Sequence, residues 1–283
     1  MAKTKQLFAA LTRRGPHRAL RGDLGFAGLP GVVYTPESGM NLPGVAFGHD
    51  WLAGVARYNG TLEHLASWGI VAAAPDTETG IAPSVLNLGF DLGTTLDIIT
   101  GVRLGPGKIS VHPTKLGLVG HGFGGSAAVV AAAGLRSAPN APKAVAALFP
   151  TASKPDADQP AAGLSTPGLI LTAPGADLTI HSNADKLAAA WKSATVRTVV
   201  KAEPGGLAEG FRLGRIVGLP GPDRRTQKTV RALLTGYLLY QLTGDKTYQD
   251  FANADVVLPK TLAAAADAER PALEDKVTTL LKG

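Results

Sequence analysis

Seven short apolar segments recur along the chain and alternate with segments of helical periodicity. The apolar segments cover residues 31–34, 44–47, 70–74, 115–119, 144–148, 168–172 and 196–201. Strands that are apolar throughout are buried on both faces, which is typical of a parallel sheet between two layers of helices. Helices are expected over residues 57–68, 84–101, 124–134, 182–193 and 226–243. The pattern predicts an α/β fold with a mostly parallel central sheet and helices on both faces.

Composition excludes several kinds of site. The 283 residues include no cysteine, which excludes a disulfide framework, a thiolate zinc site and a cysteine nucleophile. No dinucleotide fingerprint or phosphate-binding loop is present, so no cofactor is expected. Aromatic residues make up only 6% and do not alternate with basic ones, so nucleic-acid recognition is not expected. No apolar run reaches the roughly 18 residues of a membrane span, and the N-terminus lacks a signal-peptide core, which predicts a cytoplasmic location.

The positive charge is concentrated at the N-terminus. Residues 1–22 contain no acid and hold the six basic side chains that equal the whole net charge of +6, namely Lys3, Lys5, Arg13, Arg14, Arg18 and Arg21. We therefore expect a basic N-terminal arm (1–23), an α/β domain (24–257) and a helical C-terminal tail (258–283). Residues 5–12 are expected to form a short helix. It either packs on its own body or contacts an acidic partner or the inner face of the membrane peripherally.

A glycine-rich turn follows one of the predicted strands directly. The strand at 115–119 leads into Gly120-His121-Gly122-Phe123-Gly124-Gly125, and a helix of small residues comes next. A strand, a sharp turn and a closely packed helix form the context that a nucleophile elbow requires.

With this turn and three further blocks, at 47–54, 65–77 and 166–177, the sequence resembles the α/β-hydrolase superfamily. Within it, the sequence looks most like the dienelactone-hydrolase and cutinase-like polyesterase branch. The resemblance covers roughly residues 30–255. It implies an α/β-hydrolase fold in one domain and a catalytic triad in the order Ser, Asp, His.

The resemblance also implies that the triad has degenerated. The family motif Gly-x-Ser-x-Gly places its serine at Gly122, which has no hydroxyl to attack a carbonyl. The acid corresponds to Asp177. The histidine is expected in the loop after the strand at 196–201, where the sequence has Leu207 and Ala208, and no histidine follows His181. Nucleophile and general base are both missing, so no catalytic residue is expected, and Gly122, Asp177, Leu207 and Ala208 are vestigial positions.

The vestigial pocket is expected to be lined by His49, Asp50, Trp51, His121 and Phe123. The resemblance places part of an oxyanion hole at 49–51. We expect His121 to pack or to bond to the backbone, and Ser126 to be a packing or capping serine rather than a relocated nucleophile. His49, Asp50, His121, Asp177 and His181 could converge, but their spacing fits no metal motif, so no metal site is expected.

Two functional hypotheses follow. The first is a catalytically inactive α/β-hydrolase-like protein that acts as a binding or scaffolding module, either for a small acyl or lipid-like ligand in the old pocket or for a protein partner. The second is an active esterase or hydrolase with a non-standard catalytic set, Asp177 together with His121 or His49. The site rather than the fold decides between them.

Overall fold

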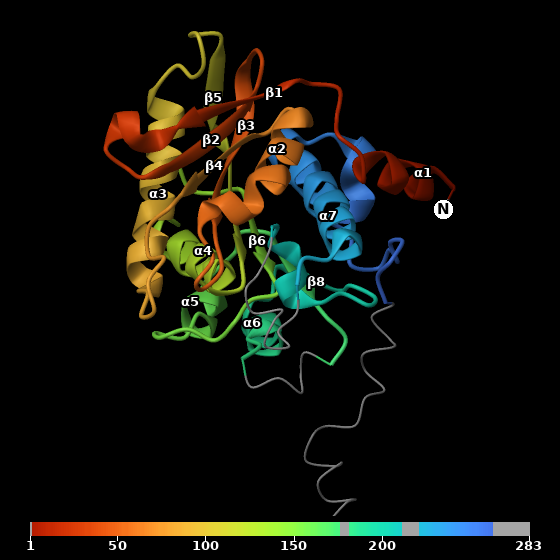
Figure 1. The fold of residues 1–283 in the computed structure, drawn as a ribbon. Coiled ribbons are helices and arrows are strands. Elements are labelled where there is room, and N and C mark those ends of the chain that lie inside the picture. Colours follow the sequence, from red (N-terminus) through yellow and green to blue (C-terminus); the bar gives the residue numbers. More distant parts are fainter. Residues whose placement is uncertain (1, 176–180, 211–220, 263–283) are drawn as a thin grey trace, which may run out of the picture.

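The computed structural model describes residues 2–175, 181–210 and 221–262 (Figure 1). Its centre is a sheet formed by β1 (Ala19–Asp23), β2 (Gly31–Pro36), β3 (Gly39–Gly48), β4 (Val71–Pro75), β5 (Ile109–His121), β6 (Ala144–Leu148), β7 (Gly168–Thr172) and β8 (Ala194–Thr198). The spatial order is β1-β2-β4-β3-β5-β6-β7-β8. β2 is antiparallel to β1 and β4, and the other neighbouring strands are parallel.

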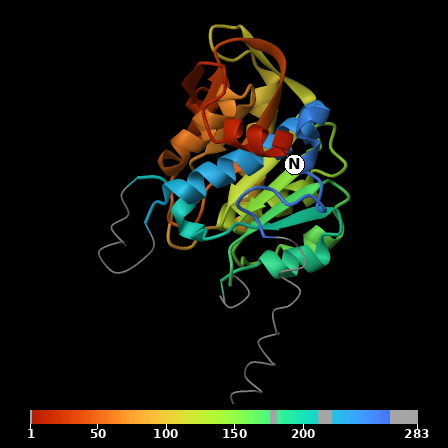
Figure 2. The same cartoon turned by 90° about the vertical axis from the view of Figure 1, so that its right-hand side faces the viewer.

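Helices cover both faces of this sheet (Figures 1 and 2). One face carries α1 (Ala2–Leu11), α2 (Asn59–Ser67) and α7 (Arg224–Thr243), and the other carries α3 (Val85–Gly101), α4 (Phe123–Gly134), α5 (Asp158–Ala162) and α6 (Ala184–Ala190). Strand side chains alternate between the two cores, as Val45 and Phe47 do on one side and Ala46 on the other. The predicted α/β class, with a mostly parallel sheet and helices on both faces, is confirmed, and it is consistent with an α/β-hydrolase-like fold.

Several element bounds differ from the prediction. β6 and β7 have the predicted bounds, whereas β3 and β5 begin several residues earlier than predicted, at Gly39 and Ile109. The added residues carry only isolated apolar side chains such as Leu42, Ile109 and Val111, and they pair through register shifts between residues 39 and 44, so no continuous apolar run marks them. β8 begins at Ala194, because that residue pairs with Gly168 of β7.

The first 23 residues form part of the body rather than a separate arm. β1 pairs with β2 along its whole length, from Ala19 opposite Pro36 to Asp23 opposite Val32. α1 packs against α7, and its Phe8 and Leu11 are buried in the core. The predicted boundary at residue 23 therefore falls within the domain, between β1 and the 3-10 helix η1 (Leu24–Ala27).

The six basic side chains of this region remain on the surface. All of them are exposed: Lys3, Lys5, Arg13, Arg14, Arg18 and Arg21. Arg14 forms an ion pair with Glu63 of α2. A contact of this basic surface with an acidic partner or a membrane remains a prediction, as does the cytoplasmic location. None of the described helices is both long enough and apolar enough to cross a membrane.

The described start of the predicted C-terminal helical tail is not helical. Leu258 is buried, and Thr261 forms a bridge with Val199 just after β8. Leu262 N donates to Thr198 O at 3.0 Å, which continues this contact along the sheet edge. Residues 258–262 therefore contact the sheet rather than begin a helix, and the remainder of the predicted tail lies outside the described residues.

His64 of α2 should make stability depend on pH. Burial, reinforced by the nearby charges of Arg231 and Arg14, lowers the pKa of His64 from 6.5 to about 4. The folded chain therefore keeps this ring neutral at a pH where the unfolded chain already binds a proton. We expect the free energy of unfolding to fall by about 3 kcal/mol as the pH decreases from 6.5 to about 4.

Urea unfolding measured across this pH range tests the expectation. His64→Leu should flatten the pH profile between pH 6.5 and about 4. His17 is exposed, so His17→Gln is a control that should keep the wild-type profile. A His64→Leu profile as steep as that of the wild type would contradict the assignment.

Candidate functional site

β5 and α4 meet in a sharp turn at Gly122. This residue has φ 54° and ψ −118°, in the region of backbone conformation that favours glycine. Its N–H donates to Leu148 O of β6 at 2.9 Å. A Cβ added at Gly120 would lie 1.9 Å from Gly124 O, so the strand and the helix are in direct backbone contact. The structure thus has the strand, the turn and the close helix that the sequence predicted.

The carboxylate of Asp50 fills the space that a side chain at position 122 would need. A Cβ built on Gly122 would lie 2.0 Å from Asp50 Oδ1 and 2.3 Å from its Cγ. Asp50 reaches this point from the loop after β3, and β3 lies beside β5 in the sheet. Its side chain is 19% exposed, so the carboxylate closes the space above Gly122 while keeping some access to solvent.

Two backbone N–H groups hold this carboxylate in place. Phe123 N donates to Asp50 Oδ1 at 3.0 Å, and Trp51 N donates to the same oxygen at 2.8 Å. Phe123 is the first residue of α4, and the N–H groups of a first helical turn lack partners within the helix and favour a negative charge. An α/β-hydrolase forms its oxyanion hole from N–H groups at these two places, after the nucleophile and in the loop after the third strand. In this chain the N–H groups at the corresponding positions, Phe123 and Trp51, both donate to Asp50 Oδ1.

A chain of hydrogen bonds uses both ring nitrogens of His121. The ring lies 2.9 Å from Pro204 O through Nε2 and 2.8 Å from Tyr58 Oη through Nδ1. A carbonyl oxygen only accepts, so Nε2 donates to it, and Nδ1 of the neutral ring accepts from the Tyr58 hydroxyl. Tyr58 Oη in turn accepts from Asp50 N at 3.1 Å. His121 is buried and bonds to the backbone, as the sequence predicted.

His49 joins two loops rather than facing the elbow. Its Nδ1 lies 2.9 Å from Asp50 O, and its Nε2 lies 2.6 Å from Thr77 O after β4. The side chain is fully buried. Both nitrogens are therefore directed at backbone carbonyls, and the ring fixes the loop that carries Asp50.

The loop after β8, where the resemblance implied a histidine, has a structural role here. Leu207 and Ala208 are fully buried in the same core cluster as Tyr58. The neighbouring Glu209 accepts from Gly60 N at 2.8 Å and from Arg231 Nη2 at 2.6 Å. The carboxylate thereby binds the first turn of α2 and joins it to α7. That positions 207 and 208 are vestigial sites of a lost catalytic histidine remains a prediction.

The other predicted site residues have separate places. Ser126 is buried and donates to Thr151 O at 2.5 Å, which fits a packing serine. Phe123 is buried, whereas Trp51 is half exposed beside Asp50. His181 is exposed, and its carbonyl pairs with Ala152 N. Asp177 lies outside the described residues. Within the described part of the chain, no group of three or more His, Asp or Glu could hold a metal ion.

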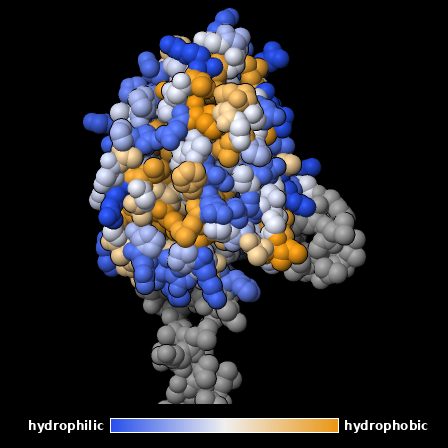
Figure 3. All heavy atoms as spheres, turned by 90° about the vertical axis from the view of Figure 1, so that its left-hand side faces the viewer, coloured by the Kyte–Doolittle hydropathy of each residue, from blue (hydrophilic) through white to orange (hydrophobic). Residues whose placement is uncertain are grey.

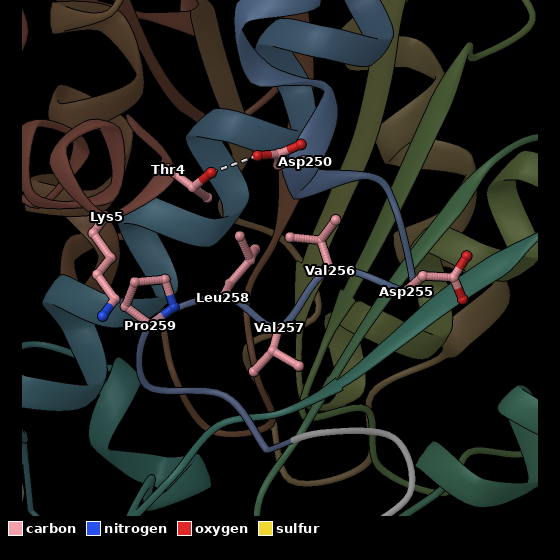
Figure 4. A pocket seen from close by; sticks show the side chains of 8 residues that line it. All are labelled: Thr4, Lys5, Asp250, Asp255, Val256, Val257, Leu258 and Pro259. Carbon is pink, nitrogen blue, oxygen red and sulfur yellow. Dashed lines mark hydrogen bonds between the residues drawn. The ribbon is translucent and has the colours of Figure 1, made fainter. Parts of the chain in front are cut away.

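A second concavity lies between α1 and the segment that follows η6 (Lys246–Phe251), as Figure 4 shows. Its volume is about 530 Å³, and its apolar wall consists of Val256, Val257, Leu258 and Pro259. Thr4 of α1 donates to Asp250 Oδ2 at 2.5 Å across one side of it. None of its lining residues comes from the elbow, so this cavity is separate from the candidate site.

Sequence reasoning missed three contributors to the site: Tyr58, the carbonyl of Pro204 and Glu209. Tyr58 belongs to the 3-10 helix η2 (Val55–Tyr58) and Pro204 begins the 3-10 helix η4 (Pro204–Leu207), neither of which has a strong sequence signal. One signal was available for Asp50. It lies in the loop where the resemblance places part of an oxyanion hole, and Gly122 leaves room for its carboxylate.

No protein-family model matches the chain, and no curated protein has a significantly similar sequence.

Proposed function

We propose that this chain is a catalytically inactive α/β-hydrolase-like protein that acts as a binding or scaffolding module. The observation that carries the proposal is the carboxylate of Asp50, which fills the place of a nucleophile side chain and accepts from both Phe123 N and Trp51 N. Acyl transfer needs a nucleophile at this place and free donors for the developing oxyanion. In this chain the Asp50 carboxylate occupies the nucleophile position and accepts hydrogen bonds from both donors.

The alternative, an esterase with a non-standard catalytic set, has less support. A general base needs a ring nitrogen that can take a proton from the attacking group. The nitrogens of His121 bond to Tyr58 and to Pro204, and those of His49 are directed at the carbonyls of Asp50 and Thr77. Each of these nitrogens already has a partner, and His121 Nδ1, which lies 4.0 Å from Asp50 Oδ2, makes its hydrogen bond to Tyr58 instead.

Between the two binding modes, a protein partner has more support than an acyl ligand in the old pocket. An acyl ligand would place its carbonyl oxygen where Asp50 Oδ1 already accepts two hydrogen bonds. Two acceptor oxygens cannot share these donors without repulsion, because neither has a proton to give. A partner on the surface needs no such rearrangement.

The test is an activity assay on the full chain. With p-nitrophenyl acetate and butyrate we expect no turnover above a heat-denatured control, and a fluorophosphonate probe should label no serine. Turnover that disappears in Asp50→Ala or in Asp177→Ala would overturn the proposal. The matched control is Asp156→Ala, because Asp156 is exposed and lies outside the candidate site.

A further inference from the structure

An apolar surface lies beside the vestigial elbow. It is formed by Trp51, Leu52, Ile81, Leu86 and Phe90, which we call the apolar patch, and each of the five is more than half exposed. Ile81 and Phe90 reach 82% and 76%. Figure 3 views the molecule from the side of α3 and shows apolar surface among polar surroundings. Scattered apolar residues are normal on a surface, whereas a contiguous group of them marks a binding site.

Hydrogen bonds hold the segments of the apolar patch together. Trp51 Nε1 donates to Ile81 O at 2.9 Å, which joins the loop after β3 to the loop after β4. Leu86 and Phe90 are four residues apart on α3 and therefore share one helix face. Glu78 accepts from Ser84 N at 2.6 Å and thereby fixes the second loop to the start of α3. The patch is thus ordered before any partner binds, which lowers the entropic cost of binding.

The charged residues of the segment that carries Ile81, Leu86 and Phe90 have one sign. Residues 76–101 contain Asp76, Glu78, Asp91 and Asp97 but no lysine or arginine. Among the described residues, none of these four carboxylates has a basic partner within 4.0 Å. A partner that covered the apolar side chains and brought Lys or Arg to this rim would gain charge complementarity.

We infer that the apolar patch binds a basic amphipathic helix of another protein. The apolar side of that helix contacts Ile81, Leu86 and Phe90, and its basic side chains face Glu78, Asp91 and Asp97. This inference rests on the proposed function, because it names the surface and the partner class of the binding module. An amphipathic helix in a groove or on a face is a recurring mode of recognition.

Two other occupants fit less well. The basic region of a second copy carries α1, whose Phe8 and Leu11 are already buried in their own core. It therefore offers basic charge without the matching apolar side chains. An anionic membrane would meet the four carboxylates of residues 76–101, and like charges repel.

The probe is a fluorescein-labelled peptide of Leu and Lys with helical spacing, about 18 residues long and so similar in length to α3. We expect saturable binding to the full chain by fluorescence anisotropy, and weaker binding by at least tenfold for a Leu/Glu peptide of the same pattern.

Leu86→Ser with Phe90→Ser should weaken binding about tenfold or more, because two apolar contacts are lost. The matched control is Val257→Ser, which removes an exposed apolar side chain at the separate cavity.

The contribution of the carboxylates to the affinity for the peptide is tested separately. Asp91→Asn with Asp97→Asn should weaken binding several-fold at low ionic strength, and the difference should shrink at about 0.5 M salt. The matched pair Asp156→Asn with Asp255→Asn removes the same charge from exposed positions elsewhere. Binding should also shift the emission of Trp51, a change that Trp51→Phe removes and Trp68→Phe keeps.

Several outcomes would overturn the inference. They are no saturable binding, equal affinity for the Leu/Glu peptide, or unchanged affinity after the Leu86→Ser and Phe90→Ser changes. Sedimentation that shows a dimer broken by these changes would assign the apolar patch to a second copy. Binding to phosphatidylserine vesicles that these changes abolish would assign it to a membrane. Esterase turnover would instead contradict the proposed function and leave the peptide result standing, so the two failures are distinguishable.

Discussion

Gly122→Ser is expected to destabilise the fold without creating a serine hydrolase. The new Cβ would lie 2.0 Å from Asp50 Oδ1, so the carboxylate must leave its place. Its departure removes two hydrogen bonds to a charged group, each of which contributes about 1.5–3 kcal/mol. Strain of a side chain in this backbone conformation adds roughly 1–3 kcal/mol. We expect the free energy of unfolding to fall by at least about 4 kcal/mol in urea unfolding, with no fluorophosphonate labelling.

Two comparisons make this result specific. Gly134→Ser introduces the same side chain at the last residue of α4, where a Cβ would meet no atom within 4 Å outside the helix's own backbone, so the change in stability should be about 0.5 kcal/mol or less. Asp50→Gly combined with Gly122→Ser removes the clash and should be more stable than Gly122→Ser alone. A Gly122→Ser variant that is as stable as the wild type, or that the probe labels, would contradict the role given to Asp50.

The class of the fold was predictable because the chain marks its strands clearly. Segments such as 144–148 and 168–172 are buried on both faces, so their apolar runs end where the strands end. β1 was not predictable in this way. Its sequence Ala-Leu-Arg-Gly-Asp is mostly exposed at the edge of the sheet, and only pairing with β2 makes it a strand. The basic residues around β1 led to the prediction of a separate N-terminal arm.

The candidate site was predictable only where the backbone determines it. The glycines at 120–124 are needed for the contact of β5 with α4, and their spacing is visible in the sequence. The partners of Asp50 and His121 come from positions far apart in the chain, as Tyr58 and Pro204 do. Such contacts depend on the packing of three loops, and no local pattern encodes them. The sequence therefore identified Asp50 as a pocket residue but not as the group that fills the pocket.

Arg197→Met is expected to be the second strongly destabilising change. Arg197 of β8 is only 4% exposed. Its guanidinium donates to Val256 O at 2.9 Å, to Asn253 O at 2.7 Å and to Asp250 O at 3.1 Å, with a longer bond to Phe251 O. Burial lowers the pKa of Arg197 to about 10, so the group stays charged at neutral pH. One side chain therefore holds the segment after η6 against the sheet.

Methionine keeps much of the apolar stem but leaves these carbonyls without donors, and each buried group left unpaired costs about 1–3 kcal/mol. We expect the free energy of unfolding to fall by about 4 kcal/mol, with faster amide exchange over residues 250–262. Arg197→Lys should lose less than Arg197→Met, because an ammonium keeps the charge but lacks the planar fork that reaches several carbonyls. The exposed Lys192→Met is the matched control. Val256 also lines the cavity of Figure 4. An Arg197→Met variant with wild-type stability and wild-type amide exchange would show that contacts other than those of Arg197 hold Val256 and its neighbours in place.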